Sequence, residues 1–545
     1  MPVLVIGATG IFGGRIARHL ARTGSRVILG GRRPAPLQAM SDELAWHWPD
    51  RAAAGIGPTI AVLDASSRES LSAALAEHRP SVVVHCAGPF QARHHADDAA
   101  YMVAETCAEH GSSYVDLADD RDFVREFGPA LDELAREKGV TLLSGCSTTP
   151  ALTTAVLEAH RPFFDGGVPA SVAVDLSPGN RLPRGLATIT SVISWCGQPV
   201  RFLRGGQGRT VVGWQQLKTV PFAGIGSRLT AACDVPCLDI LPALYPSISD
   251  LEFRAGLELR VLMWTLYGLA GVVRLTPIKD VSHLSWPVMQ ASLLFFPLGS
   301  DDGGMSMVMS GRGNDGEETT VAWHMFAGDG DGPMNPCFPC IVLAKKLSGS
   351  GSGSGVETLE VGARACAAEF TLEEMKREVS LGGYNFCFHE APLPGSDAQR
   401  QAEASMTVGA PGYSPFAMSL GAAQFDALPK GMRTFHGREG GRVTGSFTIT
   451  RGPGFLRSAL ATIGGLPKPC VDSESEVTCV PDGADEGALK WARTFGEKGN
   501  GFSSTLRFED GLCWETPDEF FGILHFGLHM QELREPGAVG FRHGE

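Results

Sequence analysis

The chain opens on an apolar run that is followed by regularly spaced glycines. Pro2–Ile6 is a short, partly β-branched segment, typical of a buried parallel strand. Gly7, Gly10 and Gly13 come next, and apolar residues then recur at helical spacing as far as Gly24. Glycine at such a turn lets backbone N–H groups and the positive end of the helix approach a pyrophosphate. The pattern therefore indicates a dinucleotide site.

Short apolar strands and amphipathic helices go on alternating as far as residue 144. The further strands expected are Arg26–Leu29, Thr59–Leu63, Ser81–Cys86, Ser113–Leu117 and Val140–Ser144, and the helices between them include Arg68–Glu77, Asp97–His110 and Arg121–Lys138. Six strands with helical connections of this length predict an α/β fold, a Rossmann-type doubly wound parallel sheet over residues 1–150. Ligands of such sheets bind at the carboxyl ends of the strands.

The pattern changes after Pro169, where glycine and proline separate shorter segments. Strands are expected at Ser171–Leu176, Ala187–Ser194 and Thr210–Trp214, a hairpin at Ser306–Gly311 and Thr319–Ala327, and helices at Leu257–Leu275, Ser285–Phe296 and Phe338–Leu347. We interpret residues 151–347 as an α+β substrate and dimerisation domain. Its last helix is expected to return to the first domain.

The remaining chain divides into a connector and a small domain. Ser348–Gly355 alternates serine with glycine, which predicts a flexible linker, and residues 348–421 are interpreted as linker and connector. Within them, Thr371 and Glu374 form a capping-box pattern at the start of a helix. Alternation from Arg442 predicts a small β-rich domain over residues 422–545, with a helix at Phe455–Ile463 and a strand at Thr505–Phe508.

The end of the second strand bears on the choice of cofactor. NAD sites place Asp or Glu there for the ribose hydroxyls, whereas this chain has Arg32 and Arg33, two guanidiniums suited to a 2′-phosphate. NADP is therefore favoured over NAD, the alternative being that both arginines belong to a solvated loop. The residues expected to bind the cofactor are Gly7, Thr9, Gly10, Ile11, Phe12, Gly13, Arg32, Arg33, Asp64, Ala65, Ala87, Gly88 and Pro89.

No catalytic residue can be assigned from spacing alone. The candidates at strand ends are Tyr114, Asp116, Asp119, Cys146 and Ser147. Asp116 is the leading catalytic candidate, although an Asp after a strand more often caps a helix or turn. Cys146 is expected to pack rather than to act as a nucleophile.

Other polar residues have a structural interpretation beside a functional one. Asn180, Arg181 and Arg184 suit an anionic substrate or a solvated loop. Asp329 and Asp331 between glycines indicate a turn, and His324 a core histidine. His94 and His95 are adjacent and cannot share a metal on a helix, so no metal site is predicted.

The charge of the chain limits the kinds of molecule that it is expected to bind. The 545 residues carry a formal net charge of −14, which argues against a nucleic-acid binder and leaves a small-molecule substrate, with a homodimer compatible. The first strand begins at Pro2, so we expect no targeting peptide before it and a cytoplasmic location with reduced cysteines. The pair Cys337 and Cys340 is interpreted as incidental.

Val261–Leu275 is too short to span a bilayer and predicts a buried helix, with contact at a membrane surface as the alternative.

Several segments together resemble a known family. They are GATGIFGG, HCAGPF, YVDLAD and SGCSTTPAL in the first domain, and SPGNRLPRGLATI, GWQQL, CDVP, FRAGLEL and AGDGDGP in the second. These motifs resemble the saccharopine dehydrogenase-like (saccharopine reductase-type) oxidoreductases, and the segment from about Phe425 resembles a C-terminal domain of unknown function. The resemblance implies NADP-dependent hydride transfer between the nicotinamide and an imine, carbonyl or enoyl substrate. The alternative is a dinucleotide-binding protein that is not catalytic, or one associated with a lipid surface.

Overall fold

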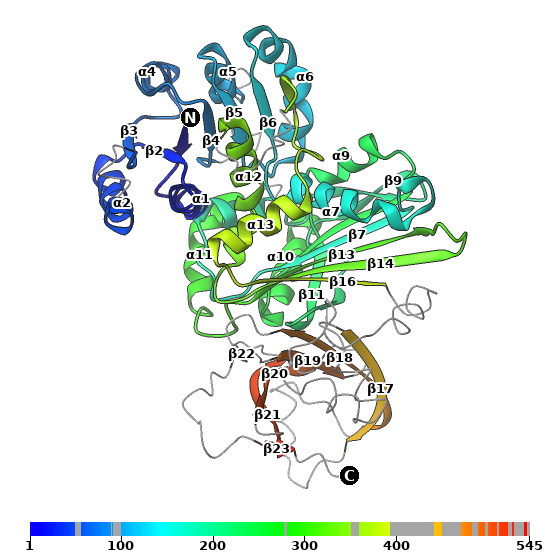
Figure 1. The fold of residues 1–545 in the computed structure, drawn as a ribbon. Helices are drawn as coiled ribbons and strands as arrows, with labels where there is room; N and C mark the ends of the chain where they lie inside the picture. The colour runs from blue at the N-terminus through cyan, green and yellow to red at the C-terminus, as the bar shows by residue number, and fades with distance from the viewer. Residues whose placement is uncertain are drawn as a thin grey trace.

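The computed structural model describes residues 1–49, 56–88, 90, 100–276, 281–349 and 359–392, and the backbone of strands between 441 and 541. Three β-sheets organise the described chain (Figure 1). The first belongs to the N-terminal domain, the second is mixed and largely antiparallel, and the third is built from the C-terminal strands.

The first sheet is entirely parallel and has seven strands in the order β15-β6-β5-β4-β1-β2-β3. The strands are β1 (Pro2–Ile6), β2 (Arg26–Gly31), β3 (Thr59–Val62), β4 (Val82–His85), β5 (Ser113–Asp116), β6 (Thr141–Ser144) and β15 (Gly362–Ala365). The order reverses between β1 and β4, which confirms a doubly wound Rossmann-type sheet. The sequence predicted the first six strands but not β15.

Helices cover this sheet and bury its apolar strands. They are α1 (Ile11–Arg22), α2 (Pro34–His47), α4 (Arg68–His78), α5 (Met102–Glu109), α6 (Arg121–Lys138) and α12 (Cys337–Ser348). α12 comes from the far end of the second domain and contacts α1, β1, β4 and β5. Its residues are almost all buried, as a helix packed on several sides requires. The predicted return of this helix to the first domain is confirmed.

The second sheet has the order β10-β11-β12-β7-β13-β14-β16, with the hairpin β8 and β9 beside β12. Its strands are β7 (Ser171–Ser177), β8 (Pro199–Arg204), β9 (Gln207–Val212), β10 (Lys218–Phe222), β11 (Gly226–Ala232), β12 (Asp250–Gly256), β13 (Gly303–Arg312), β14 (Glu318–Ala327) and β16 (Phe386–Pro392). The hairpin of β13 and β14 was predicted. The helices of this region are α7 (Thr153–His160), α8 (Leu186–Ser194), α9 (Cys237–Leu244), α10 (Arg260–Leu275) and α11 (Ser285–Leu293).

One predicted strand is wrong. Residues Ala187–Ser194 were expected to be extended, and five of these eight residues are β-branched, but Leu186–Ser194 is the helix α8. α8 packs against α11 and the adjacent 3₁₀ turn Ser282–Leu284, so helix packing outweighs a modest local preference for strand.

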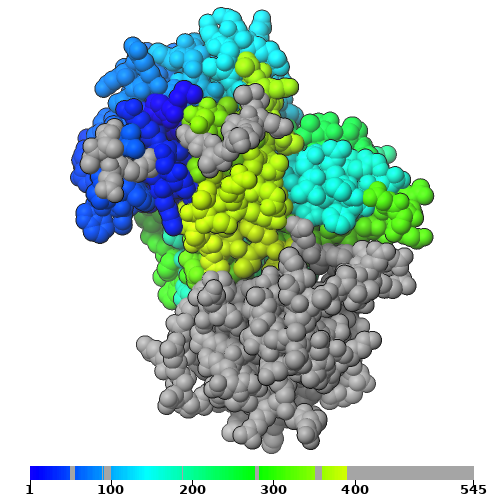
Figure 2. All heavy atoms as spheres, viewed as in Figure 1, coloured from blue at the N-terminus to red at the C-terminus, as the bar shows by residue number. Residues whose placement is uncertain are grey.

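Residues 359–392 join the two sheets, although residues 348–421 were expected to be linker and connector. β15 extends the first sheet and β16 the second, while α13 (Leu372–Gly382) lies between them with the predicted capping box of Thr371 and Glu374. Figure 2 shows this segment in yellow between the blue N-terminal residues and the cyan and green second domain. The strands were missed because GARA is very short and FCFHEAP lies in a stretch after Gly382 that shows little periodicity.

A buried charge cluster fastens α13 to the first domain. Nε2 of His19 on α1 lies 2.7 Å from Oε2 of Glu378 on α13, and Nζ of Lys345 on α12 lies 2.5 Å from the same oxygen. All three side chains are buried. Three helices from distant parts of the sequence therefore meet at one carboxylate, and α13 is part of the packed structure.

The third sheet confirms the expected β-rich C-terminal region. Its strands are β17 (Gly441–Ile449), β18 (Cys470–Pro481), β19 (Leu489–Phe495), β20 (Asn500–Glu509), β21 (Leu512–Phe521), β22 (Phe526–Gly527) and β23 (Val539–Phe541), all antiparallel to their neighbours. β19 and β20 contact β11 of the second sheet. The helix predicted at Phe455–Ile463 lies outside the described residues.

Candidate functional site

The glycine turn between β1 and α1 is closely packed on one side and exposed on the other. Gly7 has φ +82°, in the left-handed region, and a Cβ there would lie 3.2 Å from Cys86 C and Ala87 N at the end of β4. A Cβ on Gly13 would lie 2.3 Å from the carbonyl oxygen of Gly7. Gly7 and Gly13 are therefore required by the turn itself. Gly10, in contrast, is exposed, and its nearest atom would be 3.1 Å away.

The start of α1 offers free backbone donors next to Gly10. Gly10 is the N-cap and supplies no side chain, and no acid lies in the first turn. Within the described residues, no group accepts a hydrogen bond from the N–H of Ile11, Phe12 or Gly13. Unpaired N–H groups at the positive end of a helix are the ordinary binding site of a phosphate. Five predicted cofactor residues, Thr9 to Gly13, therefore form a turn whose free N–H groups suit an anion.

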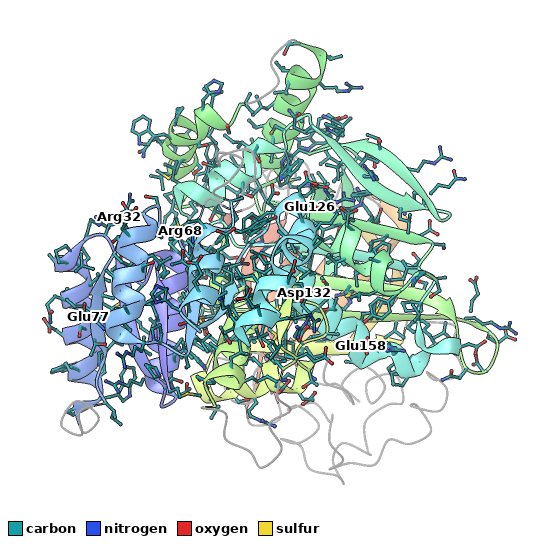
Figure 3. All side chains as sticks on the ribbon, turned by 90° about the horizontal axis from the view of Figure 1, so that it is seen from above. Arg32, Arg68, Glu77, Glu126, Asp132 and Glu158 are labelled. Carbon is teal, nitrogen blue, oxygen red and sulfur yellow. The ribbon has the colours of Figure 1, made fainter. Side chains whose placement is uncertain are left out.

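The ends of β2 and β3 lie beside this turn. The carbonyl oxygen of Gly30 accepts hydrogen bonds from the N–H groups of Gly7 and Ala8, at 3.0 and 3.1 Å. Arg32 and Arg33 follow as exposed side chains, and Arg33 is the N-cap of α2. Neither guanidinium makes a hydrogen bond or ion pair with a described residue. Figure 3 labels Arg32 on the blue N-terminal part of the ribbon.

Asp64, at the end of β3, is electrostatically coupled to Arg32. Its Oδ1 accepts hydrogen bonds from the backbone N–H and the hydroxyl of Ser66, at 3.0 and 2.7 Å. These bonds, and then the positive charge of Arg32, lower the pKa of Asp64. Arg32 and Asp64 therefore lie at one end of the site, with Ala65 next to them. The carboxylate turns toward its own loop, and its contact with the cofactor stays a prediction.

The end of β4 supplies the other predicted residues. Ala87 and Gly88 are exposed, and the N–H of Ala87 lies against Gly7, so these strand ends meet at the point where the strand order reverses. Phe90 points away into the core, where its ring lies 5.1 Å from that of His85. Pro89 lies outside the described residues.

A cavity of about 300 Å³ adjoins the exposed side of the glycine turn. Its lining comes from the turn and α1 on one side and from α2 on the other: Ala8, Thr9, Gly10, Gly14, Arg18, Pro36, Ala39, Met40 and Glu43. Arg18 and Glu43 form an ion pair across it, with an N–O distance of 2.7 Å. The cavity contains two of the predicted cofactor residues, Thr9 and Gly10.

Asp116 closes the opposite end of the site and is fully bonded. Its Oδ1 accepts hydrogen bonds from the N–H groups of Gly145 and Ala118, at 2.8 and 3.0 Å, and from the Ser144 hydroxyl at 3.1 Å. Its Oδ2 accepts one from the Tyr114 hydroxyl at 3.1 Å. Burial raises the pKa of Asp116 to about 6, although these bonds act in the opposite direction. The carboxylate joins the ends of β5 and β6, as a cap would.

The sequence interpretation missed a chain of polar groups that continues from Asp116. The Tyr114 hydroxyl also lies 3.0 Å from Nδ1 of His85, so a histidine, a phenol and a carboxylate are linked across β4 and β5. His85 and Asp116 are register partners on these strands, which a prediction of strand pairing would have shown. All three side chains are buried.

The glycine turn and the strand ends described above lie in a part of the chain that matches a known family. Residues 3–170 match the family described as the saccharopine dehydrogenase NADP binding domain. We refer to this part of the chain, after the family that it matches, as the NADP-binding domain. Residues 428–545 match a second family, a domain of unknown function (DUF4166). Among curated proteins, no sequence matches this chain.

One solved structure shares the fold over most of the chain. Apo saccharopine dehydrogenase (L-Glu forming) from Saccharomyces cerevisiae superimposes with a TM-score of 0.50 at 12% identity, over 72% of this chain and 99% of that one. At this identity the likeness concerns the fold alone. Serine dehydrogenase from Escherichia coli is 23% identical over 26% of this chain and 81% of its own, with a TM-score of 0.19, too low to bear on the argument.

The second domain reaches the NADP-binding domain through the loop after β7. A Cβ on Gly185, at the end of this loop, would lie 3.3 Å from Cδ1 of Ile11 on the glycine turn. On the following helix, the Ser191 hydroxyl donates a 2.8 Å hydrogen bond to Asp119, which follows β5. Two carboxyl ends of the first sheet are therefore covered by the second domain.

The polar residues of this loop are bonded mainly within the second domain. Nδ2 of Asn180 donates hydrogen bonds to the carbonyl oxygens of Phe295 and Leu298, at 2.6 and 2.7 Å. Arg181 pairs with Asp301 at 3.4 Å, and Arg184 donates to the carbonyl oxygen of Asn180. The two arginines are half-buried. Their location is compatible with the anionic substrate considered from the sequence.

The remaining candidates have structural roles or lie elsewhere. The Cys146 thiol is buried, burial raises its pKa, and its hydrogen bond goes to the carbonyl oxygen of Leu143. Ser147 is buried as well.

Asp329 and Asp331 hold the side-chain amide and the backbone N–H of Asn385, each at 2.8 Å, as expected of turn residues. His324 belongs to the second sheet, opposite His389, and His94 and His95 lie outside the described residues. No cluster of potential metal ligands occurs in the part of the chain that the structure describes.

Proposed function

We propose that the protein is an NADP-dependent oxidoreductase that moves a hydride between the nicotinamide and an imine, carbonyl or enoyl substrate. One observation carries the proposal: the exposed Gly10, with unpaired N–H groups beside it, lies next to a β2 end that presents Arg32 and Arg33 and no acid. That combination fits a pyrophosphate and a 2′-phosphate. The match of residues 3–170 to an NADP-binding domain supports it.

Different residues of the site would bind different parts of NADP. The N–H groups of Ile11, Phe12 and Gly13 would hold the pyrophosphate, and Arg32 with Arg33 would hold the 2′-phosphate. Ala87 and Gly88, at the end of β4, would lie on the nicotinamide side, since ligands of such sheets bind at the strand order reversal. When bound, the nicotinamide supplies or accepts the hydride, and the protein positions the substrate carbon.

The substrate would enter between the NADP-binding domain and the loop of residues 178–185. That loop approaches Ile11, and Ser191 bonds to Asp119, so the second domain lies over the carboxyl ends of β1 and β5. Arg181 and Arg184 supply positive charge there. A substrate with a carboxylate or phosphate group suits this environment.

A second candidate function is dinucleotide binding without catalysis. The burial of the catalytic candidates favours it. Asp116, Tyr114 and Cys146 are all buried, and they form hydrogen bonds with one another or with the backbone. A buried acid whose acceptors are all used is poorly placed to exchange a proton with substrate. Turnover distinguishes the two candidates.

The test is cofactor consumption by the purified full chain. NADPH oxidation would be followed with a panel of imines, enones and carbonyl compounds, with and without carboxylate groups. Oxidation above background for at least one class, absent in Gly10→Val, is the expected result. Tight NADPH binding with no oxidation by any class would support the non-catalytic candidate, and no binding would contradict both.

A further inference from the structure

The helix α10 is apolar on two opposite faces. Its buried face consists of Met263, Leu266, Ala270 and Val273, which pack in the core of the second domain. The opposite face runs at spacings of four and three residues and is exposed: Trp264, Gly268, Val272 and Leu275. Trp264 is 56% exposed and Leu275 87%. A helix on the surface of a protein in water normally carries polar residues on its outer face.

The next helix also exposes apolar side chains. Of the residues in α11, Ser285 alone is buried. Trp286 is 61% exposed and Leu294, just after the helix, 80%. Of the seventeen large apolar side chains exposed in the described residues, eight lie between 264 and 296. We call the exposed apolar side chains Trp264, Val272, Leu275, Leu284, Trp286, Leu293, Leu294 and Phe296 the α10–α11 patch.

Charge on the α10–α11 segment has the opposite sign from the rest of the protein. Residues 259–276 and 281–298 contain Arg260, Arg274 and His283 but no Asp or Glu, and the four residues between them add one Lys and one Asp, which cancel. Arg274 is exposed in the last turn of α10. The chain as a whole has a net charge of −14. The positive charge is therefore local, and it accompanies the exposed apolar side chains.

Tryptophan, leucine and arginine together on the outside of short helices are the features of a helix that lies in a membrane interface. No helix among the described residues is long and apolar enough to cross a bilayer. In Figure 3 the green helices of this segment project from the body of the molecule with side chains turned outward. We propose that the α10–α11 patch binds the surface of an anionic phospholipid bilayer, with Trp264, Trp286 and the leucines inserted at the headgroup level and Arg274 facing the lipid phosphates.

A second copy of the chain is the main alternative occupant of the patch. Positive charge argues against it, because a twofold interface would place the same positively charged segment on both sides, with no excess acid in this segment of either copy to compensate it. An anionic surface compensates this charge, at about 1 kcal/mol for each arginine near the lipid, which is about a fivefold gain in affinity.

The experiment is vesicle flotation of the full chain. Vesicles of phosphatidylcholine mixed with phosphatidylserine are compared with vesicles of phosphatidylcholine alone. We expect binding to the anionic vesicles, roughly tenfold weaker binding to the neutral ones, and a loss of about a hundredfold in the double variant Trp286→Ser with Leu294→Ser. Arg274→Gln should weaken anionic binding about fivefold and leave neutral binding unchanged.

Trp46→Ser is the matched control, because Trp46 is 77% exposed on α2, outside the patch. It should bind vesicles like the wild type. Melting temperatures of all variants show that they are folded, and Arg274→Gln tests the proposal even if the double variant is unstable. Failure of the wild type to float with anionic vesicles would overturn the proposal. So would equal loss in Trp46→Ser, or a dimer in solution that the double variant converts to a monomer without any vesicle binding.

Discussion

The two ends of the candidate site are built in opposite ways. At the glycine turn and the end of β2, Gly10, Arg32 and Arg33 are exposed, and the first N–H groups of α1 have no partner among the described residues. At the ends of β5 and β6, Tyr114 and Asp116 are buried, and four hydrogen bonds converge on the one carboxylate. The exposed end has free donors and cations that suit a ligand, and the buried end joins neighbouring strands of the sheet.

This difference separates two kinds of polar residue. Unpaired donors and cations at a surface contribute little to folding, so their presence indicates a ligand. Buried polar groups that satisfy one another are needed for stability, because each would be costly to leave unpaired. Substitutions at the buried end should therefore lower the melting temperature, while substitutions at the exposed end should lower cofactor affinity alone.

The largest effect is expected for Asp116→Ala. The substitution would leave the N–H groups of Gly145 and Ala118 and two hydroxyls without their acceptor, a cost of about 4 kcal/mol. The melting temperature should fall by about 10 °C. Asp116→Asn is the control, since its amide can keep most of these contacts. A normal melting temperature for Asp116→Ala would contradict the structural role.

The same pair of variants tests a pH effect. Burial raises the folded-state pKa of Asp116 from 3.8 to about 6, so the folded state holds this proton more tightly than the unfolded state. Its contribution to stability should therefore decrease as pH rises from about 4 to about 6 and stay constant above that. Melting curves across this range should show a shallower decline in Asp116→Asn than in the wild type. Identical slopes would show that Asp116 does not titrate in this range.

Gly13→Val should be nearly as damaging. Even the Cβ would lie 2.3 Å from the carbonyl oxygen of Gly7, so the turn must move, at a cost of about 3 kcal/mol. The melting temperature should fall by about 6–12 °C. Gly268→Ala serves as the comparison, because a Cβ there meets no atom within 4 Å. If both variants melt like the wild type, the close packing of Gly13 is not required.

Gly10→Val tests the exposed side of the same turn. Gly10 has φ −82° and ψ 174°, an extended conformation open to valine, and its Cβ would be 3.1 Å from the Gly7 oxygen, a contact that a small shift relieves. The melting temperature should stay close to that of the wild type. NADPH affinity, measured by fluorescence titration, should fall at least about a hundredfold, because two or more charge-assisted hydrogen bonds are blocked. Unchanged affinity would remove the proposed pyrophosphate site.

Arg32→Ala should have a smaller and selective effect. Losing one guanidinium contact to a 2′-phosphate should weaken NADPH about tenfold to a hundredfold and leave NADH within a few-fold. Arg33→Ala should do less, because consecutive side chains diverge. Gly31→Asp should shift preference toward NADH, and the structure has room for it, since the Cβ would meet Leu37 at an ordinary 3.7 Å. Equal losses for both cofactors in Arg32→Ala would show that this arginine does not set specificity.

The sequence predicted the local structure of the exposed end far better than the contacts of the buried one. Strand, glycine turn and helix follow one another within 22 residues, so local pattern is sufficient for them. The link from His85 through Tyr114 to Asp116 depends on the pairing of β4 with β5, which spacing along the chain does not give. The approach of Gly185 to Ile11 depends on packing between domains, as does the strand β15. Long-range pairing of short, unpatterned segments was therefore the main source of error.

Calorimetric titration of the wild-type chain with NADPH and NADH tests the central claim most directly. The exposed turn with Arg32 and Arg33 predicts one NADPH site per chain and at least about tenfold weaker binding of NADH, the contribution of one charge-assisted contact to the 2′-phosphate. Binding of NADH with equal or greater affinity, or no binding of either cofactor, would contradict the assignment of this turn as an NADP site.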